Sequence, residues 1–174
     1  MKNFLLMLLL LIPASPALAQ DFTASAFAGY ESAEDLGFES GPAVGLEAGI
    51  ADARYYARAR ARYAATPKYT GDGYQYSLEG NVTYGLWKRL GVAASYRYSA
   101  YSTSKWSKDS TNWAVGPALF FDRDTFVELL LNNDFQILNA RAGLAERFWV
   151  SVEVLHRREN RMAYGLYLGI KLDK

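Results

Sequence analysis

The sequence predicts an all-β fold, a transmembrane antiparallel up-and-down β-barrel of ten strands. Apolar and polar residues alternate with a period of two along most of the chain, which is the spacing of side chains on the two faces of a strand. The apolar phase carries aromatic residues at the ends of an apolar band, as lipid-facing strands do. After residue 19 no window is long and apolar enough for a membrane-spanning helix, so a chain that enters a bilayer must close into a barrel.

The first nineteen residues predict export. Lys2 gives a positive start, residues 4–12 form an apolar core, and Ala17-Leu18-Ala19 is a small-residue cleavage site before Gln20. The apolar core is too short for a spanning helix, and an uncleaved anchor is the alternative. We therefore divide the chain into a signal peptide, residues 1–19, and a barrel, residues 20–174.

Composition bounds the function of the predicted mature chain. It has 155 residues, one domain's worth, with 18 basic and 18 acidic side chains, so no excess of positive charge indicates nucleic acid. It has no cysteine, so an exported domain of this size gains its stability from something other than disulfides. A closed barrel in a membrane fits both facts and the aromatic content of the full sequence, 13 tyrosines, 9 phenylalanines and 4 tryptophans.

Ten segments alternate in the required way. We predict strands over residues 21–30, 42–50, 53–64, 74–87, 90–101, 111–121, 125–131, 135–144, 147–157 and 163–172. Most have the roughly 9 to 11 residues that a tilted membrane strand needs, and the seventh is short. Eight strands is the alternative. Pro117 cannot donate to a ladder, so we expect a bulge or a strand end there.

The connections alternate in length. Tight turns are predicted at 51–52, 88–89, 122–124 and 145–146, and longer polar loops at 31–41, 65–73, 102–110 and 158–162, with 132–134 as a short loop on the long-loop side. Short turns at one end and longer loops at the other are typical of outer-membrane barrels. An even strand count places both termini at the short-turn, periplasmic end.

The third strand shows the two faces most clearly, because arginines and small apolar residues alternate along it. Across the strands the apolar phase carries no charge, and its aromatic residues predict an interfacial girdle. The members of this aromatic girdle are Tyr30, Tyr55, Tyr63, Tyr96, Tyr98, Trp113, Phe121, Phe148 and Tyr164.

The opposite phase predicts an ion network inside the barrel. Lone carboxylates in apolar strands, such as Glu47 and Glu153, are costly unless they are paired, and guanidinium groups bind carboxylates in two places at once. The predicted lumen network consists of Arg54, Arg58, Arg60, Arg62, Arg97, Arg141, Lys171, Glu47, Glu79, Glu128 and Glu153. Two interpretations remain open: side chains that fill and rigidify the lumen, or a narrow, weakly anion-favouring pore lined by the basic surplus of seven against four.

These features together resemble small bacterial outer-membrane β-barrel proteins, in the broad class of the OmpX-like and OmpA-like transmembrane domains. The resemblance covers essentially all 155 mature residues and rests on pattern. It implies the lipid bilayer and the barrel-assembly machinery as partners, and a monomer in the bacterial outer membrane. Such proteins usually end in an aromatic residue that the assembly machinery reads; here residues 164–170 alternate as a terminal strand should, but Lys174 stands at the end.

Enzyme chemistry finds little support in the sequence. His156, the single histidine, lies near the end of the ninth predicted strand, where it loosely resembles the catalytic histidine of outer-leaflet lipid A deacylases. Those enzymes carry a nucleophilic serine two residues later, whereas position 158 is Arg, so the base has no hydroxyl to activate. One histidine and no cysteine also exclude the common zinc ligand sets. We expect no enzyme activity, no metal and no cofactor.

The outer loops are the remaining candidates for function. Lys105, Trp106 and Lys108 lie on one loop, and Arg157 and Arg158 begin another at the same end. Basic residues there would meet the phosphates of lipopolysaccharide, and the tryptophan would anchor at the interface; ordinary solvated loops are the alternative. We expect a structural or surface-interaction protein. The rival classes are a soluble periplasmic β-barrel or sandwich that binds a small ligand and, last, a lipid hydrolase.

Overall fold

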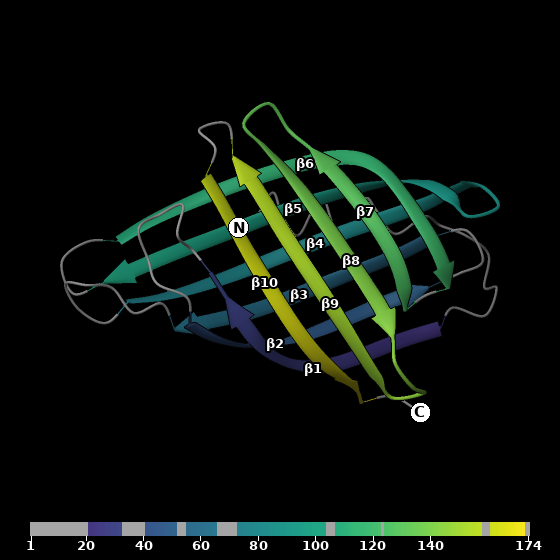
Figure 1. Cartoon of the computed structure of the whole chain (residues 1–174), viewed down its shortest axis with the longest axis horizontal. Coiled ribbons are helices and arrows are strands. Elements are labelled where there is room, and N and C mark those ends of the chain that lie inside the picture. The colour runs from purple at the N-terminus through teal and green to yellow at the C-terminus, as the bar shows by residue number, and fades with distance from the viewer. Residues whose placement is uncertain are drawn as a thin grey trace.

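The computed structural model describes residues 21–32, 41–51, 55–65, 73–103, 107–122, 124–157 and 161–172. Within these residues the chain forms ten strands: β1 (Asp21–Glu31), β2 (Gly41–Ala51), β3 (Tyr55–Ala65), β4 (Gly73–Trp87), β5 (Leu90–Thr103), β6 (Ser107–Asp122), β7 (Thr125–Leu131), β8 (Phe135–Gly143), β9 (Phe148–Arg157) and β10 (Arg161–Lys171). Each strand pairs antiparallel with its neighbours in sequence, and β1 pairs with β10, which closes the barrel (Figure 1). The predicted ten-stranded antiparallel barrel is confirmed, and the eight-stranded alternative is wrong.

Closure between the first and last strands follows the same antiparallel rule as the other ladders. β1 and β10 pair from Ser25 opposite Lys171 to Glu31 opposite Gly165. The backbone of Leu172 continues this seam, because its N–H donates to the carbonyl of Ala24 at 2.7 Å. The start of β1 and the end of β10 therefore lie at the rim that also carries the turns between β4 and β5, β6 and β7, and β8 and β9. No helix in the described part of the chain is long and apolar enough to span a membrane.

The strand boundaries agree with the prediction to within a few residues, and β6 differs most. It begins at Ser107 rather than at residue 111, because β5 continues to Thr103 and its Ser102 pairs with Ser107. The polar residues at the start of β6 were predicted to be loop. Cross-strand pairing with the long β5 keeps them extended even though their side chains are not apolar.

Pro117 marks neither a bulge nor a strand end, so that prediction is wrong. β6 runs through it in register with β5, where Pro117 lies opposite Val92. The missing donor affects the other side of β6: partners to β7 occur at Val115 and again from Ala118, so the ladder skips Gly116 and Pro117. The register shift on this edge falls later, between Phe120 and Asp122.

The turn between β4 and β5 has an unusual backbone. Lys88 has a φ of 48°, in the left-handed region that residues other than glycine rarely adopt. Two-residue hairpin turns require positive φ because their twist must match that of the strands. The turn also contacts β6, since the N–H of Phe120 donates to the carbonyl of Arg89 at 3.0 Å.

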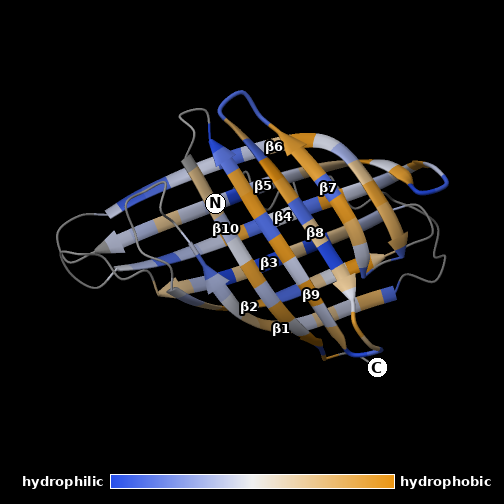
Figure 2. Cartoon of the chain, viewed as in Figure 1, coloured by the Kyte–Doolittle hydropathy of each residue, from blue (hydrophilic) through white to orange (hydrophobic). Residues whose placement is uncertain are grey.

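The outer face of the barrel is apolar. Large hydrophobic side chains on it are exposed on every strand, and the largest exposed fraction, 66%, belongs to Leu86. Figure 2 shows hydrophobic residues recurring along β7, β8 and β9, whereas the short turns between β4 and β5 and between β7 and β8 are hydrophilic. Soluble monomers rarely expose a continuous apolar surface of this kind.

The inner face contains both charged and apolar side chains. One apolar cluster joins Phe27, Ala43, Ala64, Trp149 and Tyr167. A second cluster lies beside β6, which bends in Figure 1; it combines the small side chains of Ala93, Ala114 and Ala118 with Leu130, Phe135 and Ile137. The charged network contacts the first of these clusters, where the Cζ of Arg60 lies 5.3 Å from the ring centre of Phe27.

Candidate functional site

Ten ionised side chains of the described residues meet inside the barrel. Each is at most 9% exposed, and the set is balanced, with five arginines and five glutamates: Arg58, Arg60, Arg62, Arg97, Arg141, Glu31, Glu47, Glu79, Glu128 and Glu153. They reach the lumen because each lies on the inward phase of its strand, one residue away from an outward apolar side chain. Burial of this many charges is tolerable only if they are paired and hydrogen-bonded.

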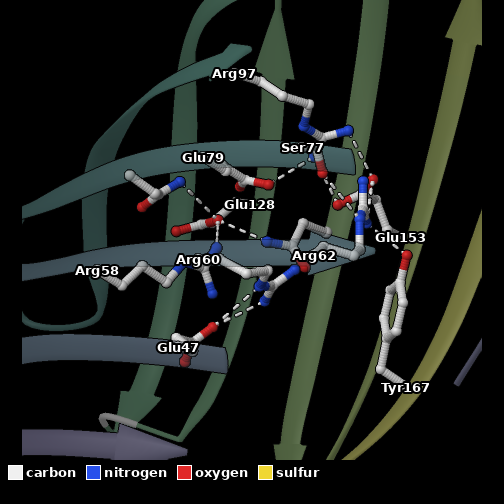
Figure 3. A network of polar contacts seen from close by, with 12 residues as sticks. Glu47, Arg58, Arg60, Arg62, Ser77, Glu79, Arg97, Glu128, Glu153 and Tyr167 are labelled. Atoms are coloured by element: carbon white, nitrogen blue, oxygen red, sulfur yellow. Dashed lines mark hydrogen bonds and ion pairs between the residues drawn. The ribbon is translucent and has the colours of Figure 1, made fainter. Parts of the chain in front are cut away.

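Glu47 of β2 is held by two arginines. Arg141 of β8 donates from Nη1 and Nη2 to the two carboxylate oxygens, each at 2.6 Å. Arg60 of β3 donates from Nε at 3.1 Å and from Nη2 at 3.0 Å to Oε2 (Figure 3). This carboxylate therefore receives the bidentate guanidinium contact that makes such pairs strong and directional.

Glu128 of β7 receives four donors from three other strands. Arg58 of β3 donates at 2.8 Å and Thr83 at 2.7 Å, while the amides of Asn139 and Asn81 donate at 3.0 and 3.3 Å. The side chain is 1% exposed. A single carboxylate thus binds β3, β4 and β8 to β7 from within the lumen.

A third cluster lies closer to the long-loop end. Arg97 of β5 contacts Glu79 at 2.8 Å and makes two bonds, of 2.9 and 2.8 Å, to Glu153 of β9. Arg62 of β3 pairs with Glu31 at 3.0 Å and with Glu153 at 3.6 Å. Arg62 also donates to the hydroxyls of Tyr167 at 2.5 Å and Ser77 at 3.2 Å; Figure 3 shows Glu153 between the two arginines.

Several of these ion pairs cross the lumen. Glu47 and Arg141 lie on β2 and β8, Arg58 and Glu128 on β3 and β7, and Arg97 and Glu153 on β5 and β9. In each case the two strands are four apart around the ten-stranded ring. Side chains that meet from strands this far apart fill the interior rather than line its wall.

Aromatic rings inside the barrel support the guanidinium groups. The Cζ of Arg141 lies 3.9 Å from the ring centre of Trp149, and that of Arg58 lies 4.6 Å from Phe126. Arg62 lies 5.5 Å from the ring of Tyr167. Cations this close to ring faces are stabilised further when water is excluded. Sequence reasoning missed these rings, although their inward phase could have identified them.

The members of the predicted lumen network are placed as follows. Arg54 lies outside the described residues. Lys171 belongs to a separate pair at the short-turn rim, where its Nζ contacts Asp124 at 2.6 Å. Glu31, which falls just beyond the predicted first strand, joins the network instead. Among the described residues, the buried network therefore holds five arginines and five glutamates.

The predicted aromatic girdle is largely on the outer face. Tyr30, Tyr63, Trp113, Phe121, Phe148 and Tyr164 are exposed, and Tyr96 and Tyr98 are half-buried. Tyr63 stacks on Tyr74 with ring centres 6.0 Å apart. Tyr55 departs from the prediction, because it is only 8% exposed although it follows the outward phase and pairs with the exposed Tyr84.

The predicted outer-loop residues are only partly described. Lys108 is exposed at the start of β6, and Arg157 is half-buried at the end of β9. Lys105, Trp106 and Arg158 lie outside the described residues, as does the predicted signal peptide. His156 is half-buried on the outward phase, opposite Gln136 of β8 and Met162 of β10. Neither of these partners carries a hydroxyl group that the histidine could activate.

Two small cavities lie at the long-loop end of the lumen. Each has a volume of about 30 Å³, and both are lined by Arg97, Tyr101, Leu155 and Arg157. A water molecule occupies about this share of liquid volume, so each cavity has room for water and not for an organic ligand. In the described ranges no group of three or more His, Cys, Asp or Glu side chains is placed to hold a metal ion.

Comparison with known proteins finds similarity in solved structures. No family model and no curated protein matches the chain. Neisserial surface protein A is 13% identical with a TM-score of 0.42, and the N-terminal β-barrel domain of Pseudomonas aeruginosa OprF is 11% identical with a TM-score of 0.43; each match covers 88% of this chain and 98% of the other. The KdgM porin, solved in complex with disordered oligogalacturonate, is 12% identical with a TM-score of 0.33 over 86% of this chain and 98% of its own. These matches identify no function for the chain.

Proposed function

We propose that this chain is an integral β-barrel of the bacterial outer membrane whose lumen is sealed by its arginine–glutamate network, and that its role is structural or one of surface interaction. One observation carries the proposal: the polarity of the barrel is inverted. Ten buried charges occupy the described interior, and large apolar side chains cover the exterior. In a bilayer this arrangement gives the apolar side chains a hydrocarbon solvent, and closure satisfies the backbone.

The rival soluble barrel needs the opposite polarity. In water, the outward Leu166, Leu168 and Ile170 of β10 would be 40–54% exposed and would forgo part of the roughly 1.5–3 kcal/mol that full burial contributes for each. The buried arginines would gain full hydration by facing outward. A barrel with its charged side chains outside and its apolar side chains inside would suit water. The observed arrangement is the reverse and therefore favours a lipid environment.

The sealed lumen favours a structural or surface role over transport. Five arginines and five glutamates neutralise one another, and their contacts cross the interior between strands on opposite sides. A conducting path would need these bidentate bonds to open, which leaves buried charges unpaired. We therefore expect no steady ion conductance from the wild-type protein, and no selectivity for anions.

Two measurements test the proposal together. The protein should require detergent or lipid for folding and should migrate differently on a gel before and after heating, as folded membrane barrels do. In a planar bilayer the wild-type protein should be silent, whereas the variant with Glu47→Ala, Arg60→Ala and Arg141→Ala should conduct. Stable folding in plain buffer would contradict the membrane assignment, and steady wild-type currents would contradict the seal.

The remaining parts of the proposal concern partners and chemistry. We assign the binding of lipopolysaccharide phosphates to the basic loops with Lys105, Trp106, Lys108, Arg157 and Arg158. We further propose that residues 1–19 direct export and that the barrel-assembly machinery inserts the chain as a monomer. Replacement of Lys105, Lys108, Arg157 and Arg158 by glutamine should weaken binding to lipopolysaccharide, and unchanged binding would reject this assignment. We expect no lipid hydrolysis, and hydrolysis that is lost in His156→Ala would overturn that expectation.

A further inference from the structure

The outer face over β2 to β5 contains a groove floored by small residues. Ala48, Ala59 and Gly80 lie opposite one another on adjacent strands, and the next row brings Ala57 and Ala94 to either side of Val82. Bulky side chains stand at the two ends of these rows, Phe22 on β1 and Trp113 on β6. The groove has a volume of about 340 Å³ and is lined by apolar groups, within the size range of ligand sites.

A basic turn lies at the short-turn end of the two central strands. Lys88 and Arg89 connect β4 to β5, and both are exposed. Each cation rests on an aromatic ring: the Nζ of Lys88 is 5.0 Å from the ring centre of Trp87, and the Cζ of Arg89 is 5.0 Å from that of Phe121. Asp122 is the acidic residue closest in sequence to Phe121, and its carboxylate accepts the N–H of Asp124 within its own turn. Among the described residues neither Lys88 nor Arg89 forms an ion pair, so both cations remain available to an anion.

The distance between turn and groove matches one lipid leaflet. Val82 and Ala94, which lie opposite each other in the groove, are six and five residues from Lys88 and Arg89. At about 3.3 Å per residue, these separations are roughly 20 and 17 Å along strands tilted by about 45°, or about 14 and 12 Å along the membrane normal. Half of a hydrocarbon core is about 15 Å thick. An acyl chain whose headgroup lies at the turn and which follows the tilted strands therefore reaches the groove.

We infer that this surface binds one anionic phospholipid of the leaflet next to the short turns, with its phosphate between Lys88 and Arg89 and an acyl chain over Ala57, Ala59, Gly80 and Ala94. This inference rests on the proposed membrane function. The positive charges of Lys88 and Arg89 favour a phosphate at the turn. The small residues of the groove leave a hollow that suits a flexible acyl chain better than a flat protein surface. An adjoining hollow of about 370 Å³, which shares Ala48 and Ala59 and extends to Leu46 and Leu172, has room for the second acyl chain.

The inference is tested by native mass spectrometry of the folded protein in detergent with added phosphatidylglycerol or phosphatidylethanolamine. The wild-type protein should retain one phosphatidylglycerol in preference to phosphatidylethanolamine. Lys88→Gln with Arg89→Gln should lose about fivefold in affinity for each charge removed, while Lys88→Arg with Arg89→Lys should retain the preference. Arg147→Gln, which removes an exposed charge from another turn of the same rim, is the matched control.

The groove is tested separately by filling it. Ala59→Leu with Ala94→Leu should abolish retention of the lipid, whereas Ala140→Leu, on the outer face of β8, should leave it unchanged. Equal binding by the glutamine variant and the wild-type protein, or by the filled and unfilled grooves, would overturn the inference. A dimer that disappears in the filled variant would overturn it in favour of a second copy of the chain.

The failure of this inference and that of the proposed function give different results. Each protein is first checked for insertion into liposomes and for a heat-dependent change in migration. A wild-type protein that inserts but retains no lipid rejects the lipid site alone. A wild-type protein that folds in buffer and does not insert rejects both.

Discussion

The inner and outer faces of β3 differ in charge, burial and partners. Arg58, Arg60 and Arg62 are buried in a dense set of ion pairs, while Ala59 and Ala61, each one residue away, face outward. The inner face depends on named partners at hydrogen-bond distance. The outer face makes no comparable contacts and requires only that its side chains be apolar and of suitable volume. The two faces of this strand therefore need different environments, polar protein partners on one side and apolar groups on the other.

This difference predicts two kinds of response to substitution. An inner-face change should depend on which partner is left behind, because an unpaired buried charge is costly. An outer-face change should depend on charge and depth, and little on the identity of the apolar residue.

The largest effect is expected inside, at Glu128. Glu128→Ala leaves Arg58 without its carboxylate and removes the acceptor for Thr83, Asn81 and Asn139. We expect the free energy of unfolding in lipid to fall by about 3–5 kcal/mol, measured by urea titration of tryptophan fluorescence. Glu146→Ala, at an exposed turn, is the control and should have almost no effect. Equal effects of the two substitutions would show that the network contributes nothing.

A charge placed on the outer face sharpens the comparison. Ala59→Arg, in the middle of β3, should destabilise the inserted protein by about 2–4 kcal/mol, and Gln136→Arg, near the end of β8, by about 0–1 kcal/mol. The same urea titration measures both. If both substitutions prove neutral, the outer face is in contact with water and not with lipid.

The ring beneath Arg141 gives a smaller inner effect. Trp149→Leu removes the aromatic face at 3.9 Å from the guanidinium carbon, whereas Trp149→Phe keeps one. We expect the leucine variant to be less stable than the phenylalanine variant by about 1–2 kcal/mol. The comparison uses the midpoints of the two urea unfolding curves, provided that the dependence of the unfolding free energy on urea concentration is the same for both. A leucine variant as stable as the phenylalanine variant would mean that the ring only fills space.

The smallest effect is expected at the stacked pair on the outer face. Tyr63 and Tyr74 have ring centres 6.0 Å apart and an interplanar angle of 23°. A double-mutant cycle with Tyr63→Leu and Tyr74→Leu should give a coupling energy of about 0.5–1.5 kcal/mol. A coupling energy near zero would mean that the two rings do not stabilise each other and that each tyrosine contributes independently at the surface.

The fold was predictable because its signals are local. Period-two alternation located all ten strands, including the short β7, whose observed bounds Thr125–Leu131 match the predicted ones. Alternation also separated inner from outer residues, since a strand has only two faces. Where the prediction failed, a neighbouring strand had decided the outcome: β5 extends β6 to Ser107, and β6 continues through Pro117 because its ladder with β5 needs no donor there.

The site was predictable as a set of residues and not as a set of pairs. The inward phase identified most of the arginines and glutamates. Which of them meet depends on the size and curvature of the closed barrel, because Glu47 and Arg141 are 94 residues apart in sequence. For the same reason Lys171 could not be matched with Asp124 in advance, and Glu31 was assigned to a loop. The buried rings were missed because aromatic residues were expected on the lipid side.

The orientation of the two faces is the central claim, and cysteine labelling tests it most directly. The chain has no cysteine, so single cysteines can be introduced in turn at the outward Ala59, Leu78 and Leu168 and at the inward Ser77 and Ser151. In liposomes, a fluorophore attached to the outward positions should be quenched by lipids with brominated acyl chains, and the inward cysteines should resist a water-soluble maleimide until the protein is unfolded. Rapid reaction of the outward cysteines with that maleimide, without quenching by the brominated lipids, would contradict the account.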